Sequence, residues 1–441
     1  MDQLNRQILQ LALPSIVSNI TVPLLGLVDQ AIVGHLGAAA YIGAVAVGTM
    51  IFNVVYWIFG FLRMSTSGLT SQAWGSRDLS EIITILIRSL LLGQAVALSF
   101  LILQRPLYLL SVTLIGPSAH LQPLVESYFQ IAVWGAPAVF GVYALTGWYV
   151  GMQNTRLPMV VSILQVTSNV ILSLFFVFAL GMKIEGVALG TMLSQWIGFL
   201  MMLIFWHHYY GRLLRYRRRL REIMRGEQLR RFFSVNRDIF LRTLFLVAVN
   251  LFFTSAGARQ GDLILSVNAL LMTFSTLFSY FMDGFANAAE ALCGRYYGAS
   301  QSSMASYRES IVLNRRLLSW GLGMAVLFSL LYFLGGHAIL RFLTNNADVL
   351  RSSTPYLVWA SLIPLTGFAA YIFDGIFIGI TATRGMLVSS AIAALFFFII
   401  YFVFESSLGN HALWLAFLCF LLFRGVIQYF WLRASKRSST L

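Results

Sequence analysis

The sequence predicts an all-α membrane protein in which twelve transmembrane helices form two pseudo-symmetric six-helix bundles. Composition is the first observation: 59% of the 441 residues are hydrophobic and only 10% are charged, whereas soluble domains carry about 25% charged residues. The second observation is a succession of apolar segments long enough to cross a bilayer. The third is a set of glycine-containing motifs in the first half that recur in the second half.

The apolar segments define the expected helices. A hydrocarbon core about 30 Å thick requires about 20 apolar residues in a helix. Helices are required because lipid cannot hydrogen-bond free backbone groups. The expected spans are 8–32, 42–68, 82–110, 124–148, 158–180, 186–209, 236–256, 264–290, 310–334, 354–378, 386–404 and 411–432.

Basic residues in the loops set the orientation of these spans. Arginines follow the even-numbered spans, and nine of them lie in the stretch between the sixth and seventh spans. By the positive-inside rule, these loops and both termini face the cytoplasm. We expect an N-terminal six-helix bundle (1–210), a basic cytoplasmic linker (211–232) that contacts anionic lipid headgroups, and a C-terminal six-helix bundle (233–441). A nucleic-acid site is not expected, because no folded domain surrounds the arginines.

An internal repeat relates the two halves. Gly34 and Gly257, like the later pair Gly75 and Gly298, are 223 residues apart. Further on, "TGWYVGMQNTR" (146–156) matches "DGIFIGITATR" (374–384) at an offset of 228 residues. One insertion of five residues reconciles the two offsets. Because six spans separate the repeats, both halves enter the membrane from the same side, which indicates a parallel repeat with substrate passing between the halves.

Ionisable residues inside the spans are the candidate functional groups, because each costs at least about 2.5–3.5 kcal/mol in the bilayer. Asp29 lies late in the first span, after Pro23 and Gly26. A proline inside a helix removes a backbone hydrogen bond and favours a bend, which can open a cavity around the carboxyl group. Asp29 is expected to bind a proton or a cation there; the alternative is a structural ion pair with an arginine.

The second half carries three more acidic candidates. Asp374 follows Pro364 in the tenth span and occupies the position of Thr146 in the repeat. It is expected either to bind an ion or a cationic substrate, or to serve helix packing. Asp283 and Glu290 are seven residues apart, so they share one face of the eighth span, and we expect that face to look into protein. Arg63 and Arg88 are the basic residues noted inside spans.

No enzyme, metal site or cofactor is expected. Cys293 and Cys419 are 126 positions apart and have no His or Cys at ligand spacing, so neither a disulfide framework nor a zinc site is indicated. A membrane-embedded enzyme would need a His or carboxylate constellation, and the sequence shows none.

Three segments together resemble the multidrug and toxic compound extrusion family: "NITVPLLGLVDQAIVGHLG" (19–37), "FMDGFANAAEALCGRYYGA" (281–299) and "DGIFIGITATRGM" (374–386). They look most like the branch named for the DNA-damage-inducible F protein. The resemblance implies a monomeric secondary antiporter of the bacterial cytoplasmic (inner) membrane. Such a protein exports small organic cations or other amphipathic drugs, and the coupling ion in this branch is a proton rather than a sodium ion.

The resemblance also assigns residues. Asp29 matches the first-span carboxylate thought to take the coupling proton, and Asn169 matches a polar residue near it. Asp283, Glu290 and Asp374 match acidic positions of the branch. Ser173 departs from the family pattern, because relatives commonly carry an acidic residue at this position. The missing second carboxylate weakens a sodium site and favours proton coupling through Asp29.

Two alternatives remain open at this stage: sodium coupling, and a lipid or lipid-linked oligosaccharide flippase of the same superfamily. Flippases of this kind tend to have basic residues in a central cavity, for which Arg63 and Arg88 are the candidates.

Overall fold

The computed structural model describes residues 3–35, 39–223, 226–300 and 304–438, and within these ranges every regular element is helical. Twelve helical segments of this part of the chain are long and apolar enough to cross a membrane. The predicted fold class is therefore confirmed. Several helices extend beyond their apolar stretches: α12 has 39 residues and α13 has 40. Hydropathy does not predict these extensions, because the added turns are polar.

Contacts divide the chain into two compact units, which we call the N-terminal unit (13–232) and the C-terminal unit (1–12 with 233–441). Residues 3–12, which belong to the N-terminal bundle in the sequence prediction, group by contacts with the C-terminal unit. The basic linker belongs to the N-terminal unit. Both boundaries fall inside helices, α1 and α11.

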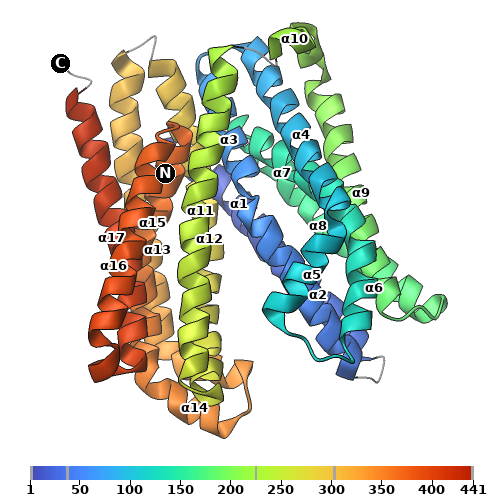
Figure 1. Ribbon diagram of the computed structural model, residues 1–441. Coiled ribbons are helices and arrows are strands. Elements are labelled where there is room, and N and C mark those ends of the chain that lie inside the picture. The colour runs from blue at the N-terminus through green and yellow to red at the C-terminus, as the bar shows by residue number, and fades with distance from the viewer. Residues whose placement is uncertain (1–2, 36–38, 224–225, 301–303, 439–441) are drawn as a thin grey trace. The chain divides into compact units, whose positions relative to one another are not determined.

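The N-terminal unit holds six of the twelve spans (Figure 1). The second span is made by α2 and α3 together, and the fourth by α6, η1 and α7. Its elements are α1 (Gln3–Gly34), α2 (Ala39–Ile58), α3 (Phe61–Gly75), α4 (Leu79–Ile102), α5 (Gln104–Ile115), α6 (Gln122–Ala132), η1 (Val133–Gly135), α7 (Ala136–Gly151), α8 (Arg156–Leu174), η2 (Phe175–Ala179), α9 (Ile184–Tyr210), η3 (Gly211–Tyr216) and α10 (Leu220–Ile223).

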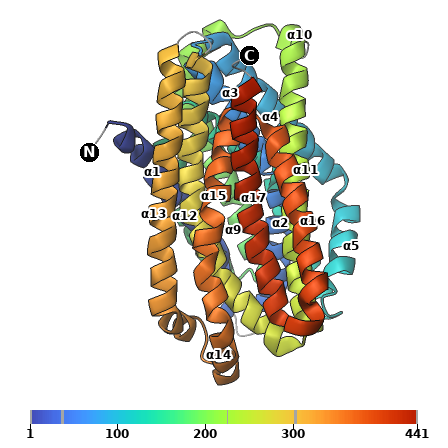
Figure 2. The ribbon, with the colours of Figure 1, turned by 90° about the vertical axis from the view of Figure 1, so that its left-hand side faces the viewer.

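The C-terminal unit holds the other six spans. Figure 2 shows α12, α13, α15, α16 and α17 side by side, with α15 packed against α12, α13 and α17. Its elements are α11 (Glu227–Arg259), α12 (Asp262–Ser300), α13 (Met304–Leu343), α14 (Ala347–Ser353), η4 (Thr354–Tyr356), α15 (Leu357–Gly379), α16 (Thr383–Leu408) and α17 (Asn410–Ser438).

The same helix-to-helix contact recurs in both units at the predicted offsets. In the N-terminal unit, a Cβ atom at Gly147 would collide with the backbone carbonyl oxygen of Arg63 on α3. In the C-terminal unit, a Cβ atom at Gly375 would collide with the carbonyl oxygen of Ala286 on α12. The glycines differ by 228 positions and their partners by 223, so the structure reproduces both sequence offsets.

The turns that follow these helices match as well. Gln153 and Thr381 occupy equivalent positions after α7 and α15, and both adopt the left-handed backbone conformation, with φ of 63° and 53°. Non-glycine residues rarely adopt it. Its occurrence at the same repeat position in both units indicates that the repeat extends to backbone geometry.

The close approach of α15 to α12 generates a stability prediction. Gly375→Ala places a methyl group against the backbone of Ala286, which cannot move without shifting a helix. We expect a loss of about 1–3 kcal/mol in the free energy of unfolding, measured as a lower thermal midpoint in detergent. Gly367→Ala on the same helix is the matched control, because its nearest side-chain atom would lie 3.5 Å away. Equal midpoints for the two variants would contradict the close-contact interpretation.

Candidate functional site

Asp29 lies on α1, six residues after Pro23, which removes one backbone hydrogen bond from the helix. Its side chain is buried, with 2% exposure. The Thr191 hydroxyl, on α9, donates a hydrogen bond of 2.8 Å to Asp29 Oδ2. Asn169 Nδ2, on α8, donates in turn to Thr191 Oγ1 at 3.1 Å. A chain of hydrogen bonds thus joins three spans at the carboxyl group.

Thr191 is a site residue that the sequence analysis missed. Asn169 was expected beside Asp29, and the structure links the two through the Thr191 hydroxyl. A single hydroxyl group in an apolar span is common and costs little free energy, so the sequence alone does not mark it as part of a site. The adjacent Gly190 is a hint in retrospect, because a glycine in a helix often marks the close approach of another segment.

Ser173 is fully buried one turn after Asn169 and packs against Gly190, where a Cβ atom would collide with its hydroxyl oxygen. A longer acidic side chain at this position would have to displace α9. Among the described residues, neither the Ser173 hydroxyl nor Asp29 Oδ1 has a hydrogen-bond partner. The phenol of Tyr128, on α6, lies near Thr191 and interacts electrostatically with Asp29.

Asp374 has a different environment. Arg242 on α11 and Arg424 on α17 both donate to its Oδ2 atom, the latter at 2.5 Å, and Gln428 Nε2 donates to Oδ1 at 2.6 Å. All four side chains are buried. Each carboxylate oxygen therefore has a strong donor, and two positive charges face one negative charge. This geometry does not favour direct binding of a cation by Asp374.

The two arginines correct the sequence analysis, which noted only Arg63 and Arg88 as basic residues inside spans. Arg242 and Arg424 lie within the expected spans 236–256 and 411–432, and the rule that made Asp29 a candidate applies to them equally. They are 132 and 50 residues from Asp374 in the sequence. The pairing itself therefore follows only from the fold.

Asp283 and Glu290 share α12 but lie in different surroundings. Glu290 is buried, with 1% exposure, and its carbonyl oxygen closely approaches Gly379. Asp283 is exposed, although it interacts electrostatically with Arg242 on α11 and with Tyr280 and Tyr371. The face that carries both residues is therefore only partly covered by protein, contrary to the expectation.

Other sequence candidates lie apart from these clusters. Within the described ranges, no three His, Cys, Asp or Glu side chains gather as ligands for a metal ion. Cys293 and Cys419 are free thiols. Arg88 is paired with Glu81 on its own helix at 3.1 Å, at the end of the N-terminal unit where the linker lies.

Two repeated six-span units, with a hydrogen-bonded buried carboxyl group in one and a compensated charge cluster in the other, define a polytopic membrane transporter. The MatE family model matches residues 14–175 and 239–403, one stretch in each half. The chain therefore belongs to the MatE family, the multidrug and toxic compound extrusion transporters, and is not an enzyme.

Similar proteins agree with this membership. DNA damage-inducible protein F of Escherichia coli K12 is 36% identical over 430 residues, which cover 94% of this chain and 89% of that protein. The probable multidrug resistance protein NorM of Chromobacterium violaceum is 26% identical, covering 84% of this chain and 79% of that protein. The crystal structure of MATE in the bent conformation matches the fold with a TM-score of 0.87 at 17% identity, covering 100% of this chain and 98% of that one.

The charge cluster predicts a selective loss of stability. Asp374→Asn leaves two buried guanidinium groups without their carboxylate, and we expect a loss of about 3–5 kcal/mol, seen as a much lower thermal midpoint in detergent. Asp283→Asn is the matched control, since its carboxylate is exposed. The double variant Asp374→Asn with Arg424→Gln removes one surplus charge and should recover part of the loss. Similar midpoints for Asp374→Asn and Asp283→Asn would refute the proposed role of the cluster.

Proposed function

We propose that this transporter is a secondary antiporter that exports organic cations and other amphipathic, drug-like compounds in exchange for protons. It works as a monomer in the cytoplasmic (inner) membrane of a bacterium, with both termini in the cytoplasm. The observation that carries the proposal is Asp29, a buried carboxyl group within a membrane span that is held only by neutral hydrogen-bonding groups among the described residues. The NorM relative, named as a probable multidrug resistance protein, supports the substrate class.

Asp29 is suited to proton binding for an electrostatic reason. A charged carboxylate in an apolar span is costly, and no salt bridge to Asp29 occurs among the described residues to offset that cost. Taking up a proton removes the charge, while the hydrogen bond from Thr191 can be kept or reversed, because a hydroxyl both donates and accepts. Proton uptake from outside and release to the cytoplasm would therefore change the polarity of the cluster in each cycle.

A sodium ion fits this cluster less well. Asn169, Ser173 and Thr191 supply neutral oxygen atoms, and Asp29 is the acidic group of the cluster. Ser173 stands where a second acid would add charge, and Gly190 leaves no space for a longer side chain there. The cluster therefore offers a cation one negative charge in a confined site. Proton coupling is the assignment that these contacts favour.

The C-terminal unit contributes to substrate binding rather than to coupling. Asp374 is buried and compensated by Arg242 and Arg424, whereas the side chain of Asp283 is exposed and can contact a positively charged substrate. Tyr280 and Tyr371 lie near Asp283, and aromatic faces attract organic cations. Asp374 and Glu290 then set the polarity of the surrounding helices.

A lipid or lipid-linked oligosaccharide flippase is the second candidate, because Arg242 and Arg424 supply the basic residues that such a function requires. Both guanidinium groups are bound to Asp374 and buried, so little of their charge is available to an anionic substrate. The exporter is therefore preferred.

Efflux from proteoliposomes tests the coupling ion. Ethidium, a fluorescent organic cation, should leave the vesicles when a pH gradient is applied and should not respond to a sodium gradient at constant pH. Asp29→Asn should abolish the pH-driven efflux while the protein stays folded, because the amide cannot exchange a proton. Asp262→Asn is the matched control at an exposed position and should retain wild-type efflux. Sodium-driven efflux that is insensitive to pH would overturn the assignment.

Thr191 provides a second test of the same site. Thr191→Val keeps the shape of the side chain but removes the hydrogen bond to Asp29, whereas Thr191→Ser keeps the hydroxyl. We expect the valine variant to lose about tenfold or more in pH-driven efflux, since a hydrogen bond to a charged group contributes about 1.5–3 kcal/mol. The serine variant should remain close to wild type. Equal efflux by the two variants would exclude a role for the hydroxyl.

A further inference from the structure

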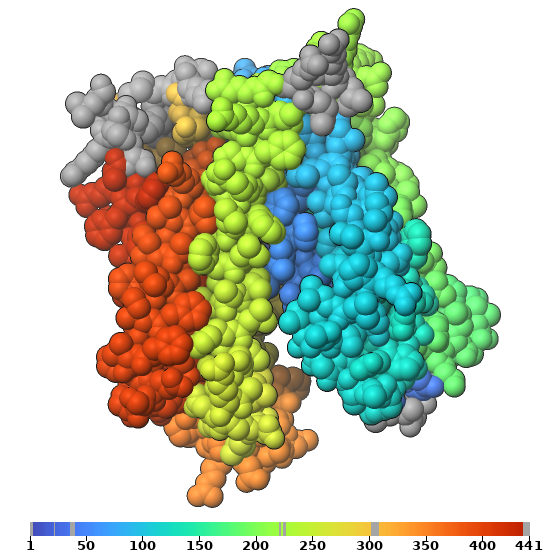
Figure 3. Space-filling view, in the orientation of Figure 1, coloured from blue at the N-terminus to red at the C-terminus, as the bar shows by residue number. Residues whose placement is uncertain are grey.

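The basic linker is a folded part of the N-terminal unit. After α9 ends at Tyr210, the chain forms η3 and the short helix α10 before α11 begins at Glu227. Figure 1 places α10 at the end of the unit where α4 starts, and Figure 3 shows the linker, in green, at the molecular surface. Six of the linker arginines have exposed side chains: Arg212, Arg215, Arg217, Arg219, Arg230 and Arg231.

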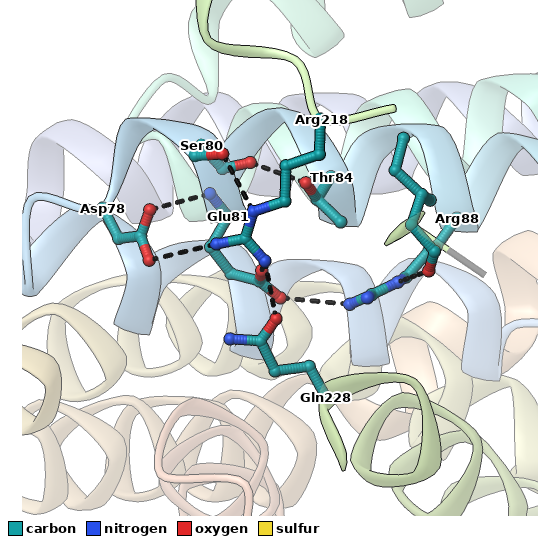
Figure 4. Close-up of polar contacts among 8 residues, drawn as sticks. Asp78, Ser80, Glu81, Thr84, Arg88, Arg218 and Gln228 are labelled. Carbon is teal, nitrogen blue, oxygen red and sulfur yellow. Dashed lines mark hydrogen bonds and ion pairs between the residues drawn. The ribbon is translucent and has the colours of Figure 1, made fainter. Parts of the chain in front are cut away.

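Arg218 is only partly exposed and points onto α4 (Figure 4). Its Nη1 atom lies 3.2 Å from Oε2 of Glu81, and its Nε atom donates to the Ser80 hydroxyl at 3.0 Å. The same Nη1 atom donates to Oε1 of Gln228 at 2.9 Å, from the first turn of α11. One guanidinium group thus joins the linker, α4 and α11.

Glu81 has a second cationic partner. Arg88, two turns further along α4, reaches Oε1 of Glu81 at 3.1 Å, and its Nε atom donates to the carbonyl oxygen of Ile223 at 2.9 Å (Figure 4). That carbonyl belongs to the last residue of α10. Further on, Arg231 Nη2 donates to Oε1 of Gln72 on α3 at 2.6 Å. The linker is therefore attached to α3 and α4 through Arg218, Ile223 and Arg231. Glu81 takes part in the first two attachments, because it binds Arg218 and also binds Arg88, the residue that contacts Ile223.

Apolar and aromatic side chains are exposed among the linker arginines. Leu214 is 39% exposed, Tyr216 is 51% exposed, and Tyr209, in the last turn of α9, is 61% exposed. Such residues are unfavourable in contact with water alone but are typical of the boundary between lipid headgroups and hydrocarbon. The candidate membrane span that contains α9 and η3 ends at Tyr216, so the linker arginines lie around the end of a span, at the level expected for headgroups. Together these residues define a surface suited to a bilayer rather than to nucleic acid.

We propose that the exposed linker arginines form a binding surface for anionic phospholipid headgroups, and that Glu81 holds this surface in place. Guanidinium groups match phosphate geometry with paired hydrogen bonds, while Leu214 and the two tyrosines contact the acyl boundary. Glu81 holds Arg218 against α4, whereas Arg212, Arg215, Arg217, Arg219 and Arg230 have exposed side chains. The interaction depends on lipid charge and is independent of the transported substrate.

Native mass spectrometry of the detergent-solubilised protein tests the surface, with phosphatidylglycerol and phosphatidylcholine as the probes. Wild-type protein should retain phosphatidylglycerol in preference to phosphatidylcholine. Arg212→Gln, Arg215→Gln and Arg217→Gln combined should reduce that retention about tenfold or more. The matched control combines Arg259→Gln, Arg341→Gln and Arg351→Gln, three exposed arginines of the C-terminal unit, and should retain phosphatidylglycerol as wild type does. An equal loss in both triple variants would overturn the proposal, because net charge alone would then explain binding.

Two further arms separate the lipid from other anions and test the role of Glu81. Inorganic phosphate in excess should not displace phosphatidylglycerol; displacement would show a site for free anions and refute lipid binding. Glu81→Gln should increase amide hydrogen exchange across 211–223 in the absence of anionic lipid, and phosphatidylglycerol should restore part of the protection. Unchanged exchange in Glu81→Gln would remove Glu81 from the proposal. A cooperative thermal transition shows that each variant is folded, and for Glu81→Gln we expect its midpoint to lie below wild type, because the buried Arg88 loses its carboxylate partner.

Discussion

The free-energy cost of placing a charged group in the apolar interior of a membrane determines how this structure surrounds its ionisable side chains. Every ionisable side chain within a span must be neutralised, hydrogen-bonded or brought to water, and the fold uses each solution at a different place. Asp29 accepts a hydrogen bond from the Thr191 hydroxyl and forms no ion pair among the described residues. Asp374 is compensated by two arginines. The two carboxyl groups therefore differ chemically, because an uncompensated carboxylate gains more from binding a proton than one paired with two arginines.

The two units share a scaffold and differ in what it carries. Gly147 and Gly375 make the same backbone contact in each unit, so the spacing of the helices is fixed by glycines and is independent of the polar residues around them. Position 146 is a threonine in the first repeat, whereas the equivalent position 374 is the aspartate that binds both arginines. The packing is common to both units, whereas single side chains differ, so one unit holds an uncompensated carboxyl group and the other a compensated charge cluster.

The sequence was sufficient for the fold because apolar length and glycine spacing are properties of local segments. It was also sufficient to select Asp29, since an isolated charge in an apolar span is conspicuous. Thr191 could not be selected, because a hydroxyl costs little in a span and its meaning depends on which helix it faces. Arg242 and Arg424 could have been noted as charges, but their partner lies 132 and 50 residues away, and only the packing of α11, α15 and α17 shows that they share one carboxylate.

The boundaries between the units have a mechanical consequence. Both boundaries, at 12/13 and at 232/233, fall inside continuous helices, α1 and α11. Pro14 lies beside the first boundary, where the missing backbone hydrogen bond makes α1 easier to bend. The second boundary follows Phe232, the residue after Arg231, and Arg231 is bonded to Gln72 of the same unit. Both boundaries therefore lie within helices rather than in loops. Because Asp29 is on α1, a bend at Pro14 shares a helix with the carboxyl group whose protonation we propose drives transport.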